Sequence, residues 1–544
     1  MKSFFTVWYL GLLVFSAGLG AQHAHTADGK RAGAAEALPA TGEYSFRIHT
    51  RNPRCQQYFN AAIAMIYGFN HDEAQRLFAR AAELDPASPM PHWGMALSLG
   101  SHINNDPEAE RERKAWEAIS RARTLTAGAP AHERRYVEAL AARYSGDANA
   151  DRKQLARNYA AAMAGLHRDF PDDPDAATLY AESLMNLNPW KYWGFDGAPT
   201  EGTLQFVGVL ESVLRRWPEH PGANHYYIHA VEASPNPERA LAAANRLGKL
   251  VPAAGHLVHM PSHIYARLGM WDGAASANAA AVGVDRSYLK GKPADGLYPL
   301  MYYPHNIHFL LYAQGAAGQC AAAAGTGKEL VAQVGPGLEA MPMLQGFVAY
   351  VYQLSVWCPS VPLAAPLAEK YALAGVAYQY ARGTRLAWGR ELTGARGALD
   401  LMRQAAGKVA PETIYEAAYT SAYLTVARAA LEARIADAAG DLAGAAVLWR
   451  EAVAAQDTLR YDEPPIWYYQ VRQSLGGVLL RAGKLGEAEA VLRESLRLQA
   501  RDGRALFLLW KVLAAQGRER EAALVEAEFR AVWKGTGVLQ VEEL

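Results

Sequence analysis

A pattern that repeats every 34 residues constrains the fold of this 544-residue chain more than any other feature. Toward the C-terminus, Leu479, Gly483 and Ala488 are each followed 34 residues later by the same residue type. A period of this length is typical of a helix-turn-helix unit. Small residues at fixed columns let two helices cross closely, and aliphatic columns fill the joint between them. The chain is therefore expected to grow by adding helix pairs rather than by linking unrelated globular domains.

Similar units occur elsewhere in the chain. The unit from Cys55 to Ser88 has small, aromatic and turn residues at the same columns, namely Ala74, Phe78, Ala81 and Pro86. The unit around Val426 to Ala455 has Gly440, Ala445, Trp449 and Ala452. Residues 132–174 and 363–408 keep the helical period but few of these signature residues. Alanine is abundant, hydrophobic residues make up 51% of the chain and β-branched runs are scarce, so an all-helical protein is favoured.

These residues resemble the tetratricopeptide repeat (TPR) superfamily, over most of Cys55 to Trp533. The resemblance implies an all-α fold, a right-handed α-α superhelix (TPR solenoid) of antiparallel helix pairs whose first helices line the concave face. The repeat length predicts roughly nine to eleven pairs. More narrowly, the chain is similar to a group of exported bacterial His-rich TPR proteins of unknown activity, which implies no particular chemistry. The strings that carry this likeness are GFNHDEA, PHWGMAL, ANHYYIHAVEAS, HMPSHIYARLG, YYPHNIHFL and YDEPPIWYYQVRQSLG.

Five segments are expected along the chain. They are a signal peptide at 1–21, a disordered leader at 22–44, N-terminal TPR-like repeats at 45–220, His-rich TPR repeats at 221–337 and C-terminal TPR repeats at 338–544. The leader is rich in Ala, Gly and Pro and lacks periodicity, which is typical of a segment that cannot bury a core.

The N-terminal segment predicts export. Lys2 supplies a positive start, an apolar run extends from Phe4 to Leu19, and small residues follow it. The protein is therefore expected to be periplasmic or secreted, with an uncleaved membrane anchor as the alternative. No later stretch approaches a membrane span, so none is expected in the mature chain. Lys plus Arg and Asp plus Glu both number 54, and this balance gives no basic surplus for binding nucleic acid.

Three cysteines leave at least one thiol unpaired in an exported chain. Cys55 opens the first repeat. Cys320 and Cys358 fall on antiparallel neighbouring helices, so the two sulfurs are able to meet. The sequence leaves two readings open, a disulfide between them or two separate buried thiols.

Histidines recur at the same positions of three successive repeats. These repeats start at Pro221, at Gly255 and, after an insertion, near Pro304. The fifth position holds His225, His259 and His308, the ninth holds His229 and His263, and the second holds His256 and His305. Offsets of three, four and seven residues share one stripe of a helix, and in TPR-like folds this stripe faces the concave groove. The competing interpretation is that duplicated repeats inherited the histidines as ordinary packing residues.

This stripe predicts a transition-metal site. His225 and His229 are four residues apart, a spacing at which two imidazoles on one helix reach one ion. The leading ligand set is His225, His229 and His263, with His259 close by. The remaining histidines of the stripe either complete this site or form a second one; they are His256, His305 and His308.

Two further residues bear on this prediction. Glu232 lies on the same stripe, seven residues after His225, and is a candidate ligand, orienting partner or catalytic general base. Pro261 either kinks the helix that carries His256 and His259 or marks its true start and leaves those two on a loop.

Nitrogen ligands with at most one carboxylate suit zinc, copper, iron or nickel better than calcium or magnesium. The sequence leaves open which metal binds and whether the site is catalytic. Two aromatic inserts at 188–198 and 288–303 either plug the superhelix or wall a small-molecule site in the groove. The alternative function is a TPR scaffold that grips a protein or peptide partner in the cell envelope through the fifth and ninth positions. A third is an assembly part whose groove is incidental.

Overall fold

The computed structural model describes residues 38–293, 296–361, 363 and 365–544. The predicted signal peptide and leader residues 22–37 lie outside the described residues. Within them the secondary structure is helical, and pairing between extended segments is limited to two isolated bridges. No helix among them has the length and apolarity needed to cross a bilayer. The all-α prediction is confirmed.

The chain forms two compact units. Among the described residues, the first consists of 38–40, 45–66 and 71–190, and the second of 41–44, 67–70 and those from 191 to 544. The helices of the first unit are α1 (Pro53–Tyr67, whose last residue groups with the second unit), α2 (His71–Leu84), α3 (Pro89–Leu99), α4 (Ala109–Thr124), α5 (Ala131–Ala141), α6 (Arg152–Asp169) and α7 (Pro174–Met185). From α2 onward each of these helices packs against the next along the chain.

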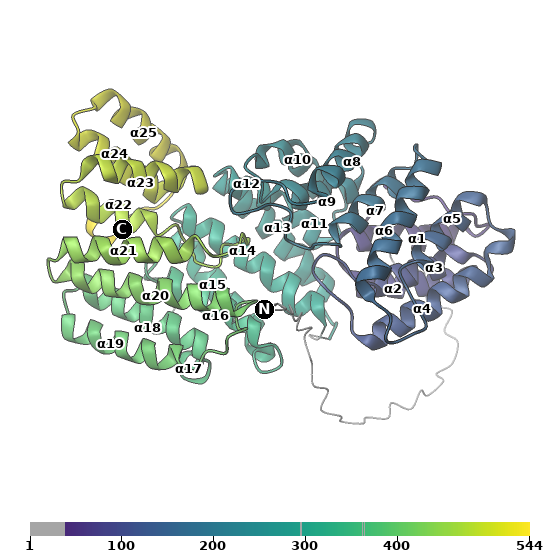
Figure 1. Cartoon of the computed structure of the whole chain (residues 1–544), viewed down its shortest axis with the longest axis horizontal. Coiled ribbons are helices and arrows are strands. Elements are labelled where there is room, and N and C mark those ends of the chain that lie inside the picture. The colour runs from purple at the N-terminus through teal and green to yellow at the C-terminus, as the bar shows by residue number, and fades with distance from the viewer. Residues whose placement is uncertain (1–37, 294–295, 362, 364) are drawn as a thin grey trace, which may run out of the picture. The chain divides into compact units, whose positions relative to one another are not determined.

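The second unit continues the same construction (Figure 1). Its helices up to the middle are α8 (Thr203–Arg216), α9 (Pro221–Val231), α10 (Leu241–Leu250), α11 (Gly255–His259), α12 (Pro261–Arg267), α13 (Trp271–Leu289), α14 (Tyr303–Ala316) and α15 (Cys320–Val334). The remaining ones are α16 (Gln345–Leu354), α17 (Ala365–Lys370), α18 (Ala372–Trp388), α19 (Leu392–Ala406), α20 (Ala417–Ala438), α21 (Leu442–Gln456), α22 (Arg472–Arg481), α23 (Leu485–Leu498), α24 (Gly503–Ala515) and α25 (Glu519–Val532). Helices also pack against the next but one, as α16 does on α18 and α18 on α20, which is the stacking of a solenoid.

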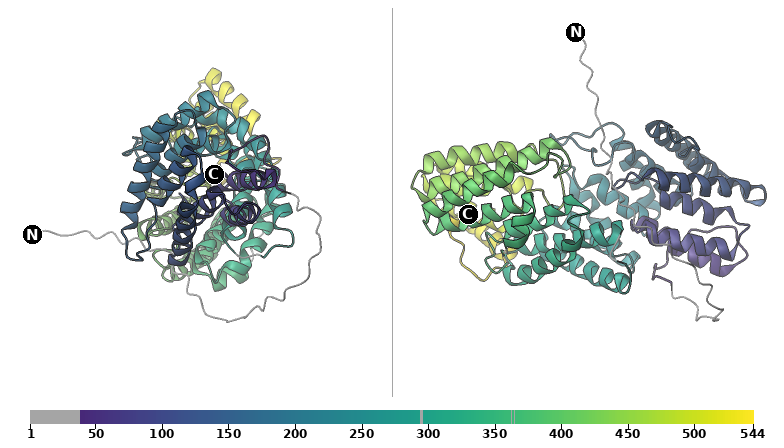
Figure 2. Two further views of the ribbon diagram at one scale, coloured as in Figure 1. Left: turned by 90° about the vertical axis from the view of Figure 1, so that its right-hand side faces the viewer. Right: turned by 90° about the horizontal axis from the view of Figure 1, so that it is seen from below.

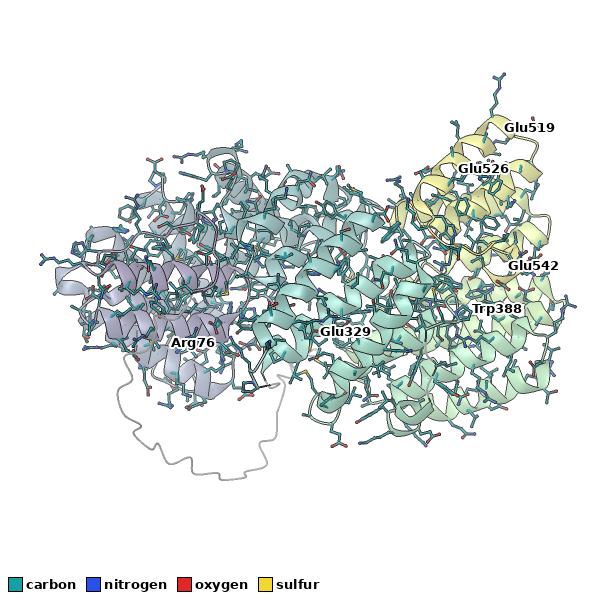
Figure 3. The ribbon with its side chains drawn as sticks, turned by 180° about the vertical axis from the view of Figure 1, so that it is seen from behind. Arg76, Glu329, Trp388, Glu519, Glu526 and Glu542 are labelled. Atoms are coloured by element: carbon teal, nitrogen blue, oxygen red, sulfur yellow. A yellow bond between two sulfur atoms is a disulfide. The ribbon has the colours of Figure 1, made fainter. Side chains whose placement is uncertain are left out.

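The small residues at equivalent positions of the repeats pack between helices as the sequence predicts. A Cβ on Gly476 would lie 2.6 Å from the Leu492 side chain, so glycine is what lets α22 and α23 touch. Gly483 and Gly517 adopt φ +71° and +73° at the turn after α22 and α24, a conformation that favours glycine. Figure 2 shows the green helices α18 to α21 side by side. Figure 3 shows the side chain of Glu519 projecting outward from the start of α25.

One helix of the second unit is broken at a proline. α11 ends at His259, and α12 begins with Pro261 as its first residue. Proline has no N–H to donate and its ring obstructs the preceding turn, so it fits the first position of a new helix. Both sequence interpretations are partly right: α12 starts at Pro261, but His256 and His259 lie on the short helix α11 rather than on a loop.

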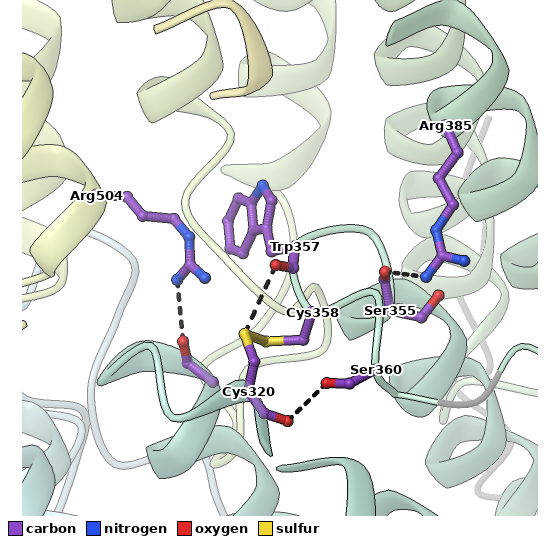
Figure 4. The surroundings of a disulfide bond; sticks show 8 residues. Cys320, Ser355, Trp357, Cys358, Ser360, Arg385 and Arg504 are labelled. Atoms are coloured by element: carbon purple, nitrogen blue, oxygen red, sulfur yellow. Dashed lines mark hydrogen bonds between the residues drawn. A yellow bond between two sulfur atoms is a disulfide. The ribbon is translucent and has the colours of Figure 1, made fainter. Parts of the chain in front are cut away.

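A disulfide joins Cys320, the first residue of α15, to Cys358, which follows α16 (Figure 4). Of the two readings left open by the sequence, the structure has the bridged one. Ser360 Oγ donates a hydrogen bond of 3.0 Å to the Cys320 carbonyl, and the Arg504 guanidinium lies 4.0 Å from the centre of the neighbouring Trp357 ring. Cys55 is a buried free thiol.

Candidate metal centre

Six of the seven histidines in the predicted stripe come together in the second unit. The first histidine group consists of His225 and His229 on α9 and His256 on α11. The second histidine group consists of His259 on α11, His263 on α12 and His305 on α14. Within each group the ligand atoms lie within 4.8 Å of one another.

The second histidine group is the tighter of the two. His259 Nε2 lies 2.8 Å from His263 Nε2 and 3.1 Å from His305 Nε2, so three ring nitrogens converge. The break at Pro261 places His259 and His263 on different helices while keeping them four residues apart. The Phe309 ring lies 5.0 to 6.0 Å from all three imidazoles and forms an apolar wall beside them.

Hydrogen bonds at the Nδ1 atoms of His259 and His263 determine which ring nitrogen carries the proton. His259 Nδ1 lies 2.6 Å from Asn278 Oδ1, and Asn278 Nδ2 donates to the Ala274 carbonyl at 2.8 Å, so the amide oxygen faces the imidazole as an acceptor. His263 Nδ1 donates to Glu232 Oε2. Both Nδ1 atoms are therefore N–H donors, and a neutral imidazole then carries a lone pair on Nε2. When both rings are neutral, two lone pairs therefore face each other at 2.8 Å between His259 and His263.

The first histidine group is built in the same way. His225 Nδ1 donates to the Tyr67 carbonyl at 2.6 Å, and His229 Nδ1 donates to Glu232 Oε1 at 2.7 Å. The free lone pair of His225 Nε2 points at His256 Nε2, which is 3.1 Å away.

Glu232 connects the two groups. It follows the last residue of α9, and its side chain is 1% exposed. Its Oε1 accepts from His229 of the first group, and its Oε2 accepts from His263 of the second. Burial by itself would raise the pKa of this carboxyl, but the neighbouring His263 and His229 lower it below its usual range. A carboxylate that accepts from the non-ligating nitrogen of histidine is the usual orienting partner at a metal site.

The imidazoles of both groups are mostly neutral. Burial, reinforced by the neighbouring imidazoles, holds the pKa values of His225, His256 and His305 well below the ordinary value. Burial also lowers the pKa of His263, but the Glu232 carboxylate outweighs it and raises that pKa overall. Neutral imidazole is the form that binds metal ions.

The structure does not bring His308 into either group. It lies one turn from His305 on α14, but its ring packs against Phe347, with centroids 5.2 Å apart, and against Tyr350 on α16 at 4.2 Å. Burial lowers its pKa to about 3. Of the predicted set, His225 and His229 lie in the first group and His263 in the second. His229, Glu232 and His263 also offer ligand atoms within 4.8 Å of one another, and the ring centres of His229 and His263 are 5.5 Å apart.

Several neighbours of the site come from distant parts of the chain. The Phe69 ring, at φ +55°, lies 4.5 Å from the His225 ring and 5.1 Å from the His256 ring. Glu463 Oε2 lies 4.0 Å from His263 Nδ1, and the Tyr461 hydroxyl donates to the same carboxylate. Burial and the charge of Glu232 raise the pKa of Glu463, against the opposing effect of His263. In the sequence this region is part of the string YDEPPIWYYQVRQSLG, and nothing in that string predicted its contact with the histidines.

The aromatic inserts lie against these helices. Trp193 Nε1 donates to the Ala230 carbonyl of α9 at 2.8 Å, and the Tyr302 ring lies 5.1 Å from the His256 ring. Tyr298 donates to Asp285 Oδ1 at 2.8 Å. These contacts are those of packing residues that back the helices and wall the first histidine group.

Fold and site together define an all-helical repeat protein with two groups of three histidines, of which five are buried and His305 is half-buried. No protein-family model and no curated protein sequence matches the chain. Among solved structures the chain is similar to human IFIT1, solved as a dimer with m7Gppp-AAAA, at 12% identity and a TM-score of 0.34 over 89% of this chain and 91% of that one. It is also similar to yeast Tom70, at 12% identity and a TM-score of 0.29 over 88% and 93% of the two chains. At these scores the likeness adds nothing to what the helices themselves show.

Proposed function

We propose that this protein binds a transition-metal ion at the second histidine group. The observation that carries the proposal is the pair of Nε2 lone pairs on His259 and His263, 2.8 Å apart, with His305 Nε2 beside them. Two lone pairs at this distance repel unless a cation lies between them. That cation is either a single shared proton or a metal ion, and the third converging imidazole favours the metal, because a proton bridges only two nitrogens.

The geometry suits a metal with small adjustments. Tetrahedral ligands at about 2.0–2.1 Å from zinc are about 3.3 Å apart. The observed separations of 2.8 and 3.1 Å are slightly shorter, so the rings need to move outward by a few tenths of an ångström. Uncharged imidazoles without thiolate suit zinc, copper, iron or nickel. Three protein ligands leave one coordination position for water or a small molecule, which is the arrangement of catalytic rather than purely structural zinc sites.

Burial of the histidines argues against the peptide-binding alternative at these positions. His225 and His259 at the fifth position are 0% exposed, and His229 and His263 at the ninth are 2% and 4% exposed. Side chains that grip a peptide must present polar atoms to solvent before the partner arrives. A metal ion or a small molecule is therefore the better occupant. The disulfide between Cys320 and Cys358 supports the proposed periplasmic or secreted location, where thiols are oxidised.

Elemental analysis by mass spectrometry tests the proposal on the full chain purified without a His tag. After reconstitution we expect at least about one equivalent of metal, which the His259→Ala variant loses. His308→Gln is the matched control, since His308 lies on α14 together with His305 but outside both groups, and this variant should keep the metal. Less than about a tenth of an equivalent in the reconstituted protein, or unchanged metal in His259→Ala, would refute the proposal.

A further inference from the structure

We propose that the first histidine group binds a second metal ion, so that the two groups form one two-ion centre joined by Glu232. This inference rests on the proposed function, but it concerns a different set of ligands: His225, His229 and His256.

Proton placement in the first group leaves nitrogens ready for an ion. The Tyr67 carbonyl is an acceptor only, so His225 Nδ1 must carry a proton, and its Nε2 keeps the lone pair. The Glu232 carboxylate imposes the same state on His229 through Nδ1. Two of the three imidazoles are therefore held with their Nε2 lone pairs available to a metal, and their ring centres are 4.8 Å apart.

His256 completes the set from the facing helix. Its side chain is 2% exposed, and its Nε2 lies 3.1 Å from that of His225. Its Nδ1 is buried without a hydrogen-bond partner. Because no partner at Nδ1 selects one tautomer, His256 is able to carry its proton on Nδ1 and offer the Nε2 lone pair to an ion.

An aromatic side chain lies against the first histidine group. Phe69 packs against all three imidazoles, with ring centres 4.5 Å from His225, 5.1 Å from His256 and 5.9 Å from His229. Its φ of +55° is uncommon for a bulky residue and persists only where the surrounding structure holds it. The ring thus shields one side of the group from water, as Phe309 does beside the second group.

Glu232 links the two ions electrostatically. Both ligand sets are uncharged, and the one carboxylate that accepts from both of them supplies negative charge between two dications. The second group has the closer convergence of nitrogens and should fill first. The first group should then bind its ion more weakly, because the ion already present repels the newcomer across the shared carboxylate.

Stepwise titration of the metal-free full chain with Zn²⁺ and with Co²⁺, followed by elemental analysis after removal of free metal, tests this inference. We expect about two equivalents for the unaltered protein, bound in two steps, and about one for His225→Ala and for His256→Ala. The ion that these variants retain shows that they are folded. His308→Gln should keep about two equivalents and serves as the control.

The outcomes separate the two proposals. One equivalent in the unaltered protein, lost in His259→Ala and retained in His225→Ala, overturns the two-ion centre and leaves the proposed function standing. Two equivalents that persist in both His225→Ala and His256→Ala also overturn it, because the second ion then binds elsewhere. No bound metal in the unaltered protein overturns both.

Discussion

Replacing Glu232 by Gln tests the most connected residue of the centre. The substitution keeps the shape of the side chain, and its single carbonyl oxygen still accepts from one of the two imidazoles, His229 or His263. The other imidazole N–H then faces an amide donor. Losing a hydrogen bond to a charged acceptor costs about 1.5–3 kcal/mol. At about 1.4 kcal/mol for each factor of ten, affinity for the ion held by that imidazole should fall about 10- to 100-fold.

Competition of Glu232→Gln against a chromophoric chelator, with Zn²⁺ at fixed pH and ionic strength, measures this loss directly. Glu211→Gln is a suitable control, because Glu211 accepts from Tyr227 and Arg239 at a partly exposed position outside both groups. The reasoning is refuted if Glu232→Gln binds metal within about twofold of the unaltered protein. It is equally refuted if the control loses as much affinity as the variant.

The metal-free protein should lose stability as pH falls below about 6.5, because imidazoles whose pKa is lowered in the folded state take up protons only on unfolding. Each such imidazole lowers the free energy of unfolding by up to about 1.4 kcal/mol per pH unit. Urea midpoints at pH 5 that equal or exceed those at pH 7 would contradict this. Reducing the disulfide should lower the free energy of unfolding by about 4 kcal/mol for a closed loop of 38 residues, and an unchanged urea midpoint would count against it. Gly222→Ala would place a Cβ 2.5 Å from the buried Tyr67 ring and displace the carbonyl that holds His225, so the protein should lose its weaker ion and keep the tighter one; a full complement of metal would show that this contact does not matter.

Much of the fold and part of the site follow from the sequence. The glycine and alanine columns predicted close helix pairs, and Gly476 and Ala488 are buried where that pattern requires. Histidines at equivalent positions of successive repeats were predicted to lie close together, because the repeat period sets which face each helix turns to its neighbour. His308 departs from the others because its ring packs against Phe347 and Tyr350 of α16, a contact with the following repeat that the histidine spacing does not reveal.

The rest of the centre depends on contacts between segments that no repeat period relates. Tyr67 is the last residue of α1, and Phe69 lies in the turn that follows it within the first repeat. Glu463 comes from a loop 200 residues beyond His263. A backbone carbonyl leaves no residue-type signal at all. The tautomers of His225 and His259, which determine where an ion is able to bind, therefore became visible only with the hydrogen bonds of the folded chain.

Because the centre depends on these distant segments, the histidine-bearing repeats cannot be transferred or isolated on their own without losing part of it. A fragment excised at 221–337 would carry all seven histidines of the stripe, yet it would lack the carbonyl oxygen that orients His225 and the Glu463 carboxylate beside His263. Grafting the three histidine-bearing repeats into another solenoid would transfer the ligands without the partners that aim them. Any shortened version of this protein that is to keep its chemistry must therefore retain both Tyr67–Asn70 and the Tyr461 loop.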